Sequence, residues 1–299
     1  SELLAVGLGD LIERHEILRT ALVNRNGEPV QLVHERVPLP LEVVDLADDS
    51  DDQWERLLRS TVRTRIELDK APLVRWTLVR RGEGRHSLIG IEHHAIHDGW
   101  SFVVVLSELS ELYSARVEGR APNLPPPLLQ FGDFAHWERV ALTPELEREQ
   151  LNYWRGALDR DPPLLELPVD RPRPQQESFA GGSVRRQVDP SLFADVRTLA
   201  REEGGTSFMA CLAAFATLLG RHADSDEVQV GSGLANRRDP AAERLVGMLV
   251  TTVALLIDTS GDPTVRELLR RVPDTVGGGM VNADVPFDRV VEALAPQRQ

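Results

Sequence analysis

The chain has 299 residues, of which 41% are hydrophobic and 27% charged, and this balance is typical of a globular protein with one or two domains. The formal net charge of −13 and the lack of clustered lysine or arginine argue against binding to nucleic acid or to a membrane surface. The single cysteine, Cys211, excludes an internal disulfide, and its apolar neighbours predict a packed core residue in a reducing, cytoplasmic protein.

The first half of the chain alternates between helical and strand patterns. Apolar residues recur at helical spacing almost from Ser1, so we expect the chain to be cut from a longer polypeptide. Helices are expected at 2–14, 51–66 and 101–113, and strands at 29–34, 41–44, 73–79 and 87–91. Ser101 is the expected N-cap of the third helix.

The second half begins with a helical region at 131–158, and the proline-rich stretch 161–176 that follows predicts a linker. Helices are then expected at 190–203, 207–221, 264–272 and 287–294, and strands at 183–188, 227–230, 246–252 and 253–257. This alternation predicts a mixed α/β fold with two lobes, 1–160 and 177–299.

A dense group of ionisable residues lies at 92–101, where His93, His94, His97 and Asp98 fall within six residues. Histidine exchanges protons near neutral pH, and a carboxylate close by can orient or charge the imidazole. Adjacent side chains of a strand point to opposite faces, so only one of His93 and His94 is expected to face a substrate. The segment predicts acid–base chemistry, against the alternative of a polar strand end with surface histidines.

A metal site is a further alternative, because His93 and His97 are four residues apart and Glu92 and Asp98 offer oxygen ligands. The segment is expected to be a strand end that turns at Gly99, and no other cysteine or histidine cluster completes a site, so no metal is predicted. The turn at 231–233 lacks the spacing of a nucleotide-binding loop, and no GxSxG elbow indicates a serine hydrolase.

Six segments, in order, resemble motifs of the condensation domains of nonribosomal peptide synthetases. They are Arg14–Thr20 (RHEILRT), His93–Ser101 (HHAIHDGWS), Phe131–Trp137 (FGDFAHW), Gly231–Arg237 (GSGLANR), Val246–Thr252 (VGMLVTT) and Asn282–Asp288 (NADVPFD). The second contains the HHxxxDG pattern of the family's active site. The paired histidines argue against heterocyclisation relatives, and the first two segments together argue against epimerisation relatives.

The resemblance implies a chloramphenicol acetyltransferase-like fold of two lobes, each a sheet flanked by helices, arranged as a V-shaped pseudo-dimer. It implies an acyltransferase that moves an acyl or peptidyl group from an upstream carrier-protein thioester to the α-amine of a downstream aminoacyl thioester. The partners would be these two carrier proteins with their phosphopantetheine arms, and adenylation and carrier domains are expected beside the chain. No permanently bound cofactor is implied.

By the same resemblance, His94 is the central residue and accepts a proton from the attacking amine or orients it. The Gly99 N–H is expected to stabilise the oxyanion, and no covalent acyl-enzyme is expected, because no activated serine or cysteine is evident. Asp98 is expected to pair with Arg14 or Arg19 and to shape the loop. His93 is expected to be structural, and the residues expected to line the substrate tunnel are Trp100, Ser101, Ser232 and Thr251.

The chain departs from the family pattern at three positions: Thr251 stands where Asn is usual, Leu249 where Phe is usual, and His97 where Ser or Ala is common. The family's opening and closing segments are also expected to lie outside this chain. A catalytically degenerate module that docks carrier proteins is therefore an alternative, as is an acyltransferase with a soluble amine or alcohol acceptor. The donor acyl group and the acceptor amino acid stay open.

Overall fold

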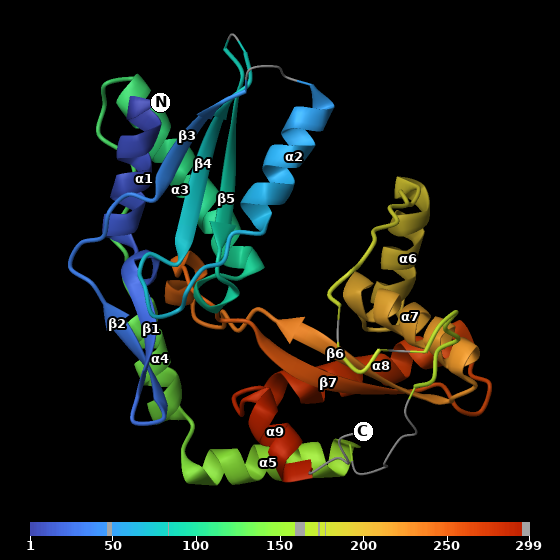
Figure 1. The fold of residues 1–299 in the computed structure, drawn as a ribbon. Helices are drawn as coiled ribbons and strands as arrows, with labels where there is room; N and C mark the ends of the chain where they lie inside the picture. The colour runs from blue at the N-terminus through green and yellow to red at the C-terminus, as the bar shows by residue number, and fades with distance from the viewer. Residues whose placement is uncertain (47–49, 83, 159–164, 173, 177, 295–299) are drawn as a thin grey trace. The chain divides into compact units, whose positions relative to one another are not determined.

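The computed structural model describes residues 1–46, 50–82, 84–158, 165–172, 174–176 and 178–294 (Figure 1). The chain divides into two compact units, one of residues 1–141 with 235–250 and the other of residues 142–234 with 251–299. The lobes expected at 1–160 and 177–299 stay predictions, and the linker expected at 161–176 lies outside the described residues at 161–164 and 173.

The first unit is built around a sheet in the order β3–β4–β5, in which β3 runs parallel to β4 and β5 runs antiparallel to it. A separate antiparallel hairpin, β1–β2, follows the first helix. The strands are β1 (Thr20–Arg25), β2 (Glu28–Val33), β3 (Leu41–Asp45), β4 (Val74–Arg80) and β5 (His86–Glu92). The helices are α1 (Glu2–Arg14), α2 (Asp51–Val62), α3 (Gly99–Val117) and α4 (Phe131–Ala141).

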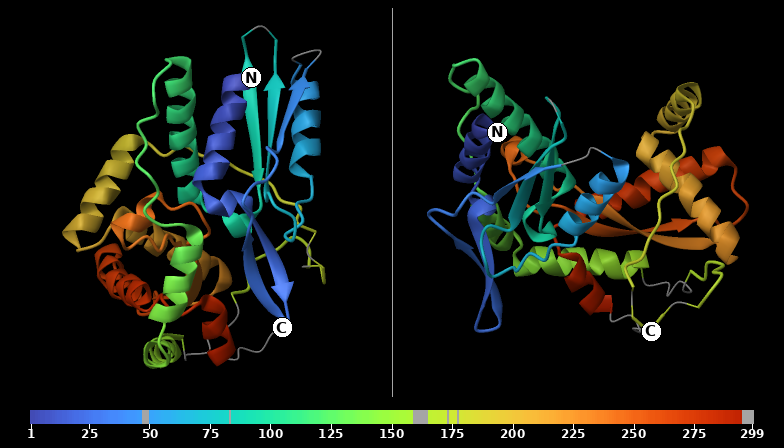
Figure 2. Two further views of the ribbon diagram at one scale, coloured as in Figure 1. Left: turned by 90° about the vertical axis from the view of Figure 1, so that its left-hand side faces the viewer. Right: turned by 45° about the horizontal axis from the view of Figure 1, so that its top comes forward.

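The core of the first unit joins α1 and α3 to the central strand β4. Leu8 and Leu11 of α1, one helical turn apart, pack with Leu109 of α3 and with Val74 and Trp76 of β4. Because β4 is the central strand, Val74 and residues 76–79 are buried on both faces, whereas Arg75 is exposed and Arg80 is half-buried. Helix α2 lies beside β5 (Figures 1 and 2) and contributes no fully buried residue. The core thus fixes β5 and α3, which carry the histidine-rich segment between them.

The second unit has one described pair of antiparallel strands, β6 (Glu227–Leu234) and β7 (Thr251–Asp258). Its helices are α5 (Pro144–Leu158), α6 (Pro190–Glu202), α7 (Ser207–Ala223), α8 (Val265–Val281) and α9 (Phe287–Leu294). Buried side chains of β7, α7 and α8 form its core, among them Leu255, Ala216 and Val272. The segment 235–250, which connects β6 to β7, belongs to the first unit.

The mixed α/β class expected from the sequence is confirmed, and the differences are local. The strand expected at 183–188 is wrong: these residues form neither helix nor strand, and Val184 is 86% exposed. The segment expected as a strand at 246–252 becomes one only from Thr251. Helix α8 continues past Pro273, where a stop was expected. Cys211 is exposed on α7, not packed in the core.

Candidate active site

The histidine-rich segment connects the end of β5 to the start of α3. Strand β5 ends at Glu92, and a short 3₁₀ helix, His94–Ile96, follows. His93 caps this turn by accepting a hydrogen bond at Nδ1 from Ala95 N, 3.1 Å away. The expectation that His93 and His94 alternate along a strand is therefore wrong, because the strand has already ended. The His93 ring is held to the backbone of this turn.

The ring of His94 is exposed, and its orientation is set by the backbone of the same loop. His94 Nδ1 lies 3.2 Å from the His97 carbonyl oxygen. A carbonyl oxygen only accepts hydrogen bonds, so in the neutral ring this contact requires the hydrogen on Nδ1 and leaves the lone pair on Nε2. No hydrogen bond is seen at Nε2 among the described residues. This nitrogen is available to an incoming group.

Asp98 is the N-cap of α3, and this residue is 2% exposed. Its Oδ1 accepts hydrogen bonds from Ser101 N at 2.8 Å and from Arg237 Nη2 at 3.0 Å. Its Oδ2 accepts from Arg237 Nη1 at 2.8 Å and from Leu249 N at 3.1 Å. The expectation that Ser101 is the N-cap is therefore wrong by three residues: Ser101 is the residue whose N–H the cap satisfies.

The partner of Asp98 is Arg237, which corrects the expected pairing with Arg14 or Arg19. The Arg237 and Asp98 side chains are only 3% and 1% exposed, and the contact is bidentate. Burial disfavours the charged carboxylate, but the hydrogen bonds from Arg237, Ser101 and Leu249 outweigh it and lower the pKa of Asp98 to about 2. The carboxylate stays ionised and acts as a fixed anchor of the loop.

The Ser101 hydroxyl joins the same anchor to the segment 235–250. It is fully buried, lies 2.8 Å from both Asp98 Oδ1 and the Gly247 carbonyl oxygen, and accepts from Gly247 N at 3.0 Å. Ser101 was expected to line a tunnel, but its hydroxyl is used inside the unit. Trp100, next to it, is 48% exposed and donates from Nε1 to the Glu243 carbonyl oxygen at 2.8 Å.

Arg14 and Arg19 have other partners within the first unit. Arg14 donates from Nε to Glu108 Oε2 on α3 at 2.8 Å, and His15 Nε2 lies 2.7 Å from the same oxygen. Burial opposes the charge on Glu108, but these two partners hold the pKa of its carboxyl below the usual value. Arg19 donates to the His34 carbonyl oxygen at 2.6 Å and pairs with Glu16. The Arg14–Thr20 segment thus ties α1 to α3 and to the hairpin.

Gly99 and Trp100 occupy the first turn of α3, where backbone N–H groups have no partner within the helix. Ser101 N is capped by Asp98, and Phe102 N donates to the Asp98 carbonyl oxygen at 3.1 Å. The N–H groups of Gly99 and Trp100 have no such partner among the described residues. They lie at the positive end of the helix dipole, where a developing negative charge is stabilised.

Ser232 and Thr251 belong to the second unit. Ser232 lies in β6 opposite Val253, and Thr251 opens β7 opposite Leu234. Arg237 was missed as a site residue, although the resemblance contained it as the last residue of the GSGLANR segment. The sequence shows an arginine directly after a run of small residues. The spacing between positions 98 and 237 does not indicate that the two side chains meet.

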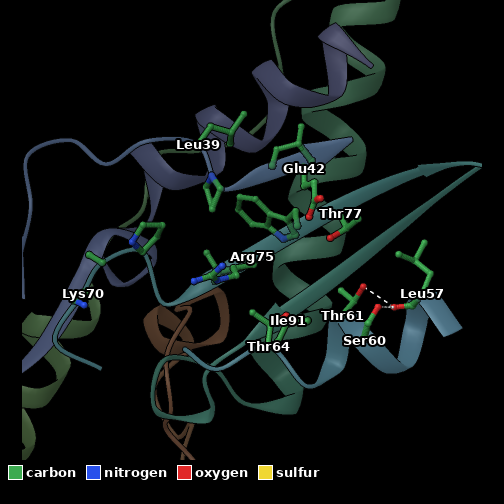
Figure 3. A pocket seen from close by; sticks show the side chains of 16 residues that line it. Leu39, Glu42, Leu57, Ser60, Thr61, Thr64, Lys70, Arg75, Thr77 and Ile91 are labelled. Carbon is green, nitrogen blue, oxygen red and sulfur yellow. Dashed lines mark hydrogen bonds between the residues drawn. The ribbon is translucent and has the colours of Figure 1, made fainter. Parts of the chain in front are cut away.

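A separate cavity of about 640 Å³ lies between α2 and the sheet of the first unit (Figure 3). Its polar lining includes Arg75 and Thr77 from β4, Glu42 from β3, and Ser60 and Thr61 from α2. The two α2 hydroxyls donate to the Leu57 carbonyl oxygen, as the dashed lines in Figure 3 show. No residue expected in the active site lines this cavity, so the two sites are distinct.

Within the described part of the chain, no group of three or more histidine, cysteine, aspartate or glutamate side chains comes together as a possible metal site. The same residues contain no single helix that is long and apolar enough to cross a membrane. Only α6 and α7, taken together across a 99° bend, meet that criterion of length and composition.

A mixed α/β chain in which a strand delivers an HHxxxDG loop to the first turn of a helix is of the chloramphenicol acetyltransferase-like class. The model of the condensation domain family matches residues 1–299. The chain therefore belongs to the condensation domain family of nonribosomal peptide synthetases, as the six sequence segments predicted.

The relatives agree with this assignment. A linear gramicidin synthase of Brevibacillus parabrevis is 38% identical over 295 residues, which are 97% of this chain and 6% of that protein. Among solved structures, the X-domain from teicoplanin biosynthesis is 28% identical with a TM-score of 0.87, and the match covers 100% of this chain and 67% of that one. The SgcC5 protein of Streptomyces globisporus is 30% identical with a TM-score of 0.79, over 98% and 67% of the two chains. The chain thus spans a small part of the synthase it matches.

Proposed function

We propose that the chain forms an amide bond between two carrier-bound substrates, with His94 as the residue that receives or orients the attacking amine. The observation that supports this role is the contact between His94 Nδ1 and the His97 carbonyl oxygen, which leaves the lone pair of Nε2 for a proton. An exposed imidazole in this tautomer is suited to general-base action, worth about 10²–10⁴-fold in rate, or to positioning of the amine.

In the proposed reaction, the amine nitrogen attacks the carbonyl carbon of the donor thioester. A C–N bond forms, the carbonyl oxygen becomes an oxyanion, and the amine proton passes to His94 Nε2. Collapse of this intermediate breaks the C–S bond and returns the donor arm as a thiol, which takes up the proton. No side chain is acylated at any step, so the balance needs no nucleophile from the protein.

The N-terminus of α3 is the proposed site of oxyanion stabilisation. The Gly99 N–H lies in the first helical turn, next to the loop that carries His94, and has no acceptor among the described residues. Asp98 takes no part in proton transfer in this proposal, because its carboxylate is occupied by Arg237, Ser101 and Leu249. Its role is to hold the helix start and the loop in register. A preorganised hydrogen-bond donor such as the Gly99 N–H raises kcat by roughly 10²–10³-fold.

The substrates that fit this proposal are thioesters on the phosphopantetheine arms of an upstream donor carrier and a downstream acceptor carrier. Adenylation and carrier domains beside the chain in its parent protein would supply them. The arms are substrates, and the chain itself needs no resident cofactor for the steps above. Ser232 and Thr251 are proposed to contact the arms from the second unit.

The test is product formation on the acceptor carrier, with the chain in its parent protein and a panel of aminoacyl-loaded carriers. His94→Ala should abolish the dipeptidyl product seen by intact-protein mass spectrometry, because neither proton acceptance nor amine orientation remains. His136→Ala, which removes a histidine of α4 outside the loop, is the matched control and should retain full turnover. Circular dichroism should show that both variants stay folded.

Two alternatives have their own outcomes in the same assay. Carrier binding without turnover by the unaltered protein would favour a docking module. Turnover of a free amine or alcohol at the rate of the carrier-bound acceptor would favour a soluble-acceptor acyltransferase. Full activity in His94→Ala would contradict the proposal directly.

A further inference from the structure

A second pair of ionisable side chains lies beside His94 and has no part in the steps proposed above. Glu92 is the last residue of β5, and His97 follows the short helix that begins at His94. His97 Nε2 lies 3.3 Å from Glu92 Oε2, and the two side chains are 21% and 12% exposed. The contact does not meet the geometry of a hydrogen bond, and neither atom has a hydrogen-bond partner among the described residues. Each of these buried polar atoms therefore has the other as its ion-pair contact.

The surroundings of the pair favour one proton shared between the two side chains. Val74, opposite Glu92 in the sheet, is fully buried, and the ring of Phe102 meets that of His97 edge-on at 6.0 Å. Burial raises the pKa of Glu92 to about 7. Burial also lowers the pKa of His97, an effect that Asp98 opposes and His94 reinforces. Desolvation thus disfavours both charged forms near neutral pH.

The backbone of His97 connects this pair to His94. Its carbonyl oxygen lies 3.2 Å from His94 Nδ1. His97 ends the 3₁₀ turn in an extended conformation, with φ −153° and ψ 141°, so its carbonyl is outside the helical hydrogen-bond pattern. The side chain of the same residue contacts Glu92 and Phe102, so these neighbours restrain the residue that carries the carbonyl.

We propose that Glu92 and His97 form a positioning pair, which holds the His97 carbonyl against the His94 ring and so keeps the ring hydrogen of His94 on Nδ1. Neither residue touches substrate in this inference. Its effect on turnover rests on the proposed function of His94, whereas its effect on the His94 ring does not.

The experiment follows the His94 tautomer by side-chain ¹⁵N NMR at neutral pH, with the resonance assigned from its loss in His94→Gln. The variants are Glu92→Ala, His97→Ser, both changes together, and Glu92→Gln. Glu42→Ala, which removes an exposed glutamate from β3 of the same sheet, is the matched control. Turnover on loaded carriers and the free energy of unfolding are measured beside the spectra.

We expect each single variant and the double variant to gain the Nε2–H form of His94 and to lose about 10- to 100-fold in kcat, with little change in KM. Glu92→Gln, whose amide is able to donate to His97 Nε2, should keep the Nδ1–H form of His94, and Glu42→Ala should change neither the tautomer nor kcat. A purely structural pair gives a different result. The double variant, which removes the carboxylate and the imidazole together, would then recover both stability and kcat.

An unchanged His94 tautomer in Glu92→Ala and His97→Ser would overturn the inference. If Glu92→Ala does not fold, Glu92→Gln and His97→Ser decide the matter. A tautomer shift in a protein that shows no turnover would contradict the proposed function and leave the positioning pair standing.

Discussion

Asp98 is held as a fixed negative charge inside the first unit. Arg237 meets both of its oxygens, and Ser101 and Leu249 donate to it from the backbone. A buried carboxylate in such a setting depends on every donor around it, because the desolvation cost of the charge remains when a partner is removed. The same residue caps α3 and bonds the segment 235–250, so one carboxylate fixes the loop of His94 from two directions.

Removal of Arg237 should therefore be far more damaging than removal of an exposed arginine. Arg237→Ala leaves a buried carboxylate unpaired and is expected to lower the free energy of unfolding by about 3–5 kcal/mol. Arg59→Ala, which breaks an exposed pair with Glu55 on α2, should change it by less than about 1 kcal/mol. Urea unfolding of the three proteins at neutral pH measures both values.

The difference in the free energy of unfolding between Arg237→Ala and the parent protein should become smaller at acidic pH. The pKa of Asp98 in the folded parent, about 2, is below its ordinary value of 3.8, so its stabilising effect is present above pH 3.8. That effect, roughly 2 kcal/mol, is lost as the pH falls from about 4 to 2. In the variant, a protonated Asp98 no longer carries an unpaired charge. A difference that stays constant from pH 7 to pH 3 would contradict this account.

At the residue scale, the sequence predicted the importance of His94 and Asp98 but not the partner of Asp98. Arg14 and Arg19 were expected to pair with Asp98 because they lie in a dense motif. Arg14 instead pairs with Glu108, a residue of α3 that no motif singled out. Arg237 lies 139 positions beyond Asp98. Periodicity reports on neighbours within an element, and a pairing across such a separation depends on the tertiary fold.

At the scale of elements, the connection between β5 and α3 places the site. Strand β5 is held by β4, and α3 is held by α1 through their shared core and the Arg14–Glu108 pair, so the loop between them has both ends fixed. The segment 235–250 forms the third boundary of the loop, and at Gly247 it lies close to Phe131 of α4. A Cβ at this glycine would lie 2.7 Å from Phe131 Cε2 of α4, which is closer than such atoms can approach.

Gly247→Ala is expected to destabilise the protein by about 1–3 kcal/mol, because the Phe131 ring or the backbone must move. Gly277→Ala in α8 is the matched control, since a Cβ there meets nothing within 4 Å and the helix should gain up to about 1 kcal/mol. Thermal unfolding compares the two. Equal melting temperatures for both variants would show that the ring moves without cost, and Gly247→Ala with Phe131→Leu should recover part of the loss.

Elements with strong periodicity were predicted well, and those that depend on a partner were not. Helix α1 and strands β4 and β5 agree with their patterns to within one or two residues. The alternation at 183–188 lacks a neighbouring strand to pair with among the described residues, and β1 was missed because it follows directly on the RHEILR segment. Pro273 was expected to end α8, but the helix continues across it and buries Val276 beyond.

At the scale of the whole molecule, the first unit is made from two stretches of chain that are far apart in sequence. Residues 1–141 carry His94, and residues 235–250 carry Arg237, Gly247 and Leu249. The two stretches come close where Asn236 donates to Glu138 of α4 at 3.3 Å. The alternation of elements predicted two lobes, but a return of the chain to the first unit has no signature in periodicity or in proline content.

A fragment of residues 1–141 alone should therefore not unfold cooperatively, because Asp98 loses its arginine and the core loses Val246. A second fragment, in which a short glycine–serine linker joins residue 141 to residues 235–250, should recover a cooperative transition. Urea unfolding followed by tryptophan fluorescence distinguishes the two. Equal midpoints and slopes for both fragments would mean that 235–250 contributes nothing to the unit.

The return of residues 235–250 to the first unit also bears on how such domains can be recombined. A chimaera with a single crossover between positions 141 and 235 would combine the HHxxxDG loop of one parent with the arginine of the other. Asp98 and its arginine partner would then come from different parents, even if both parents were active synthetases. An exchange that transfers residues 1–141 and 235–250 together keeps the Asp98 carboxylate with its own arginine. The part to exchange is therefore these two segments together, and not one continuous stretch of chain.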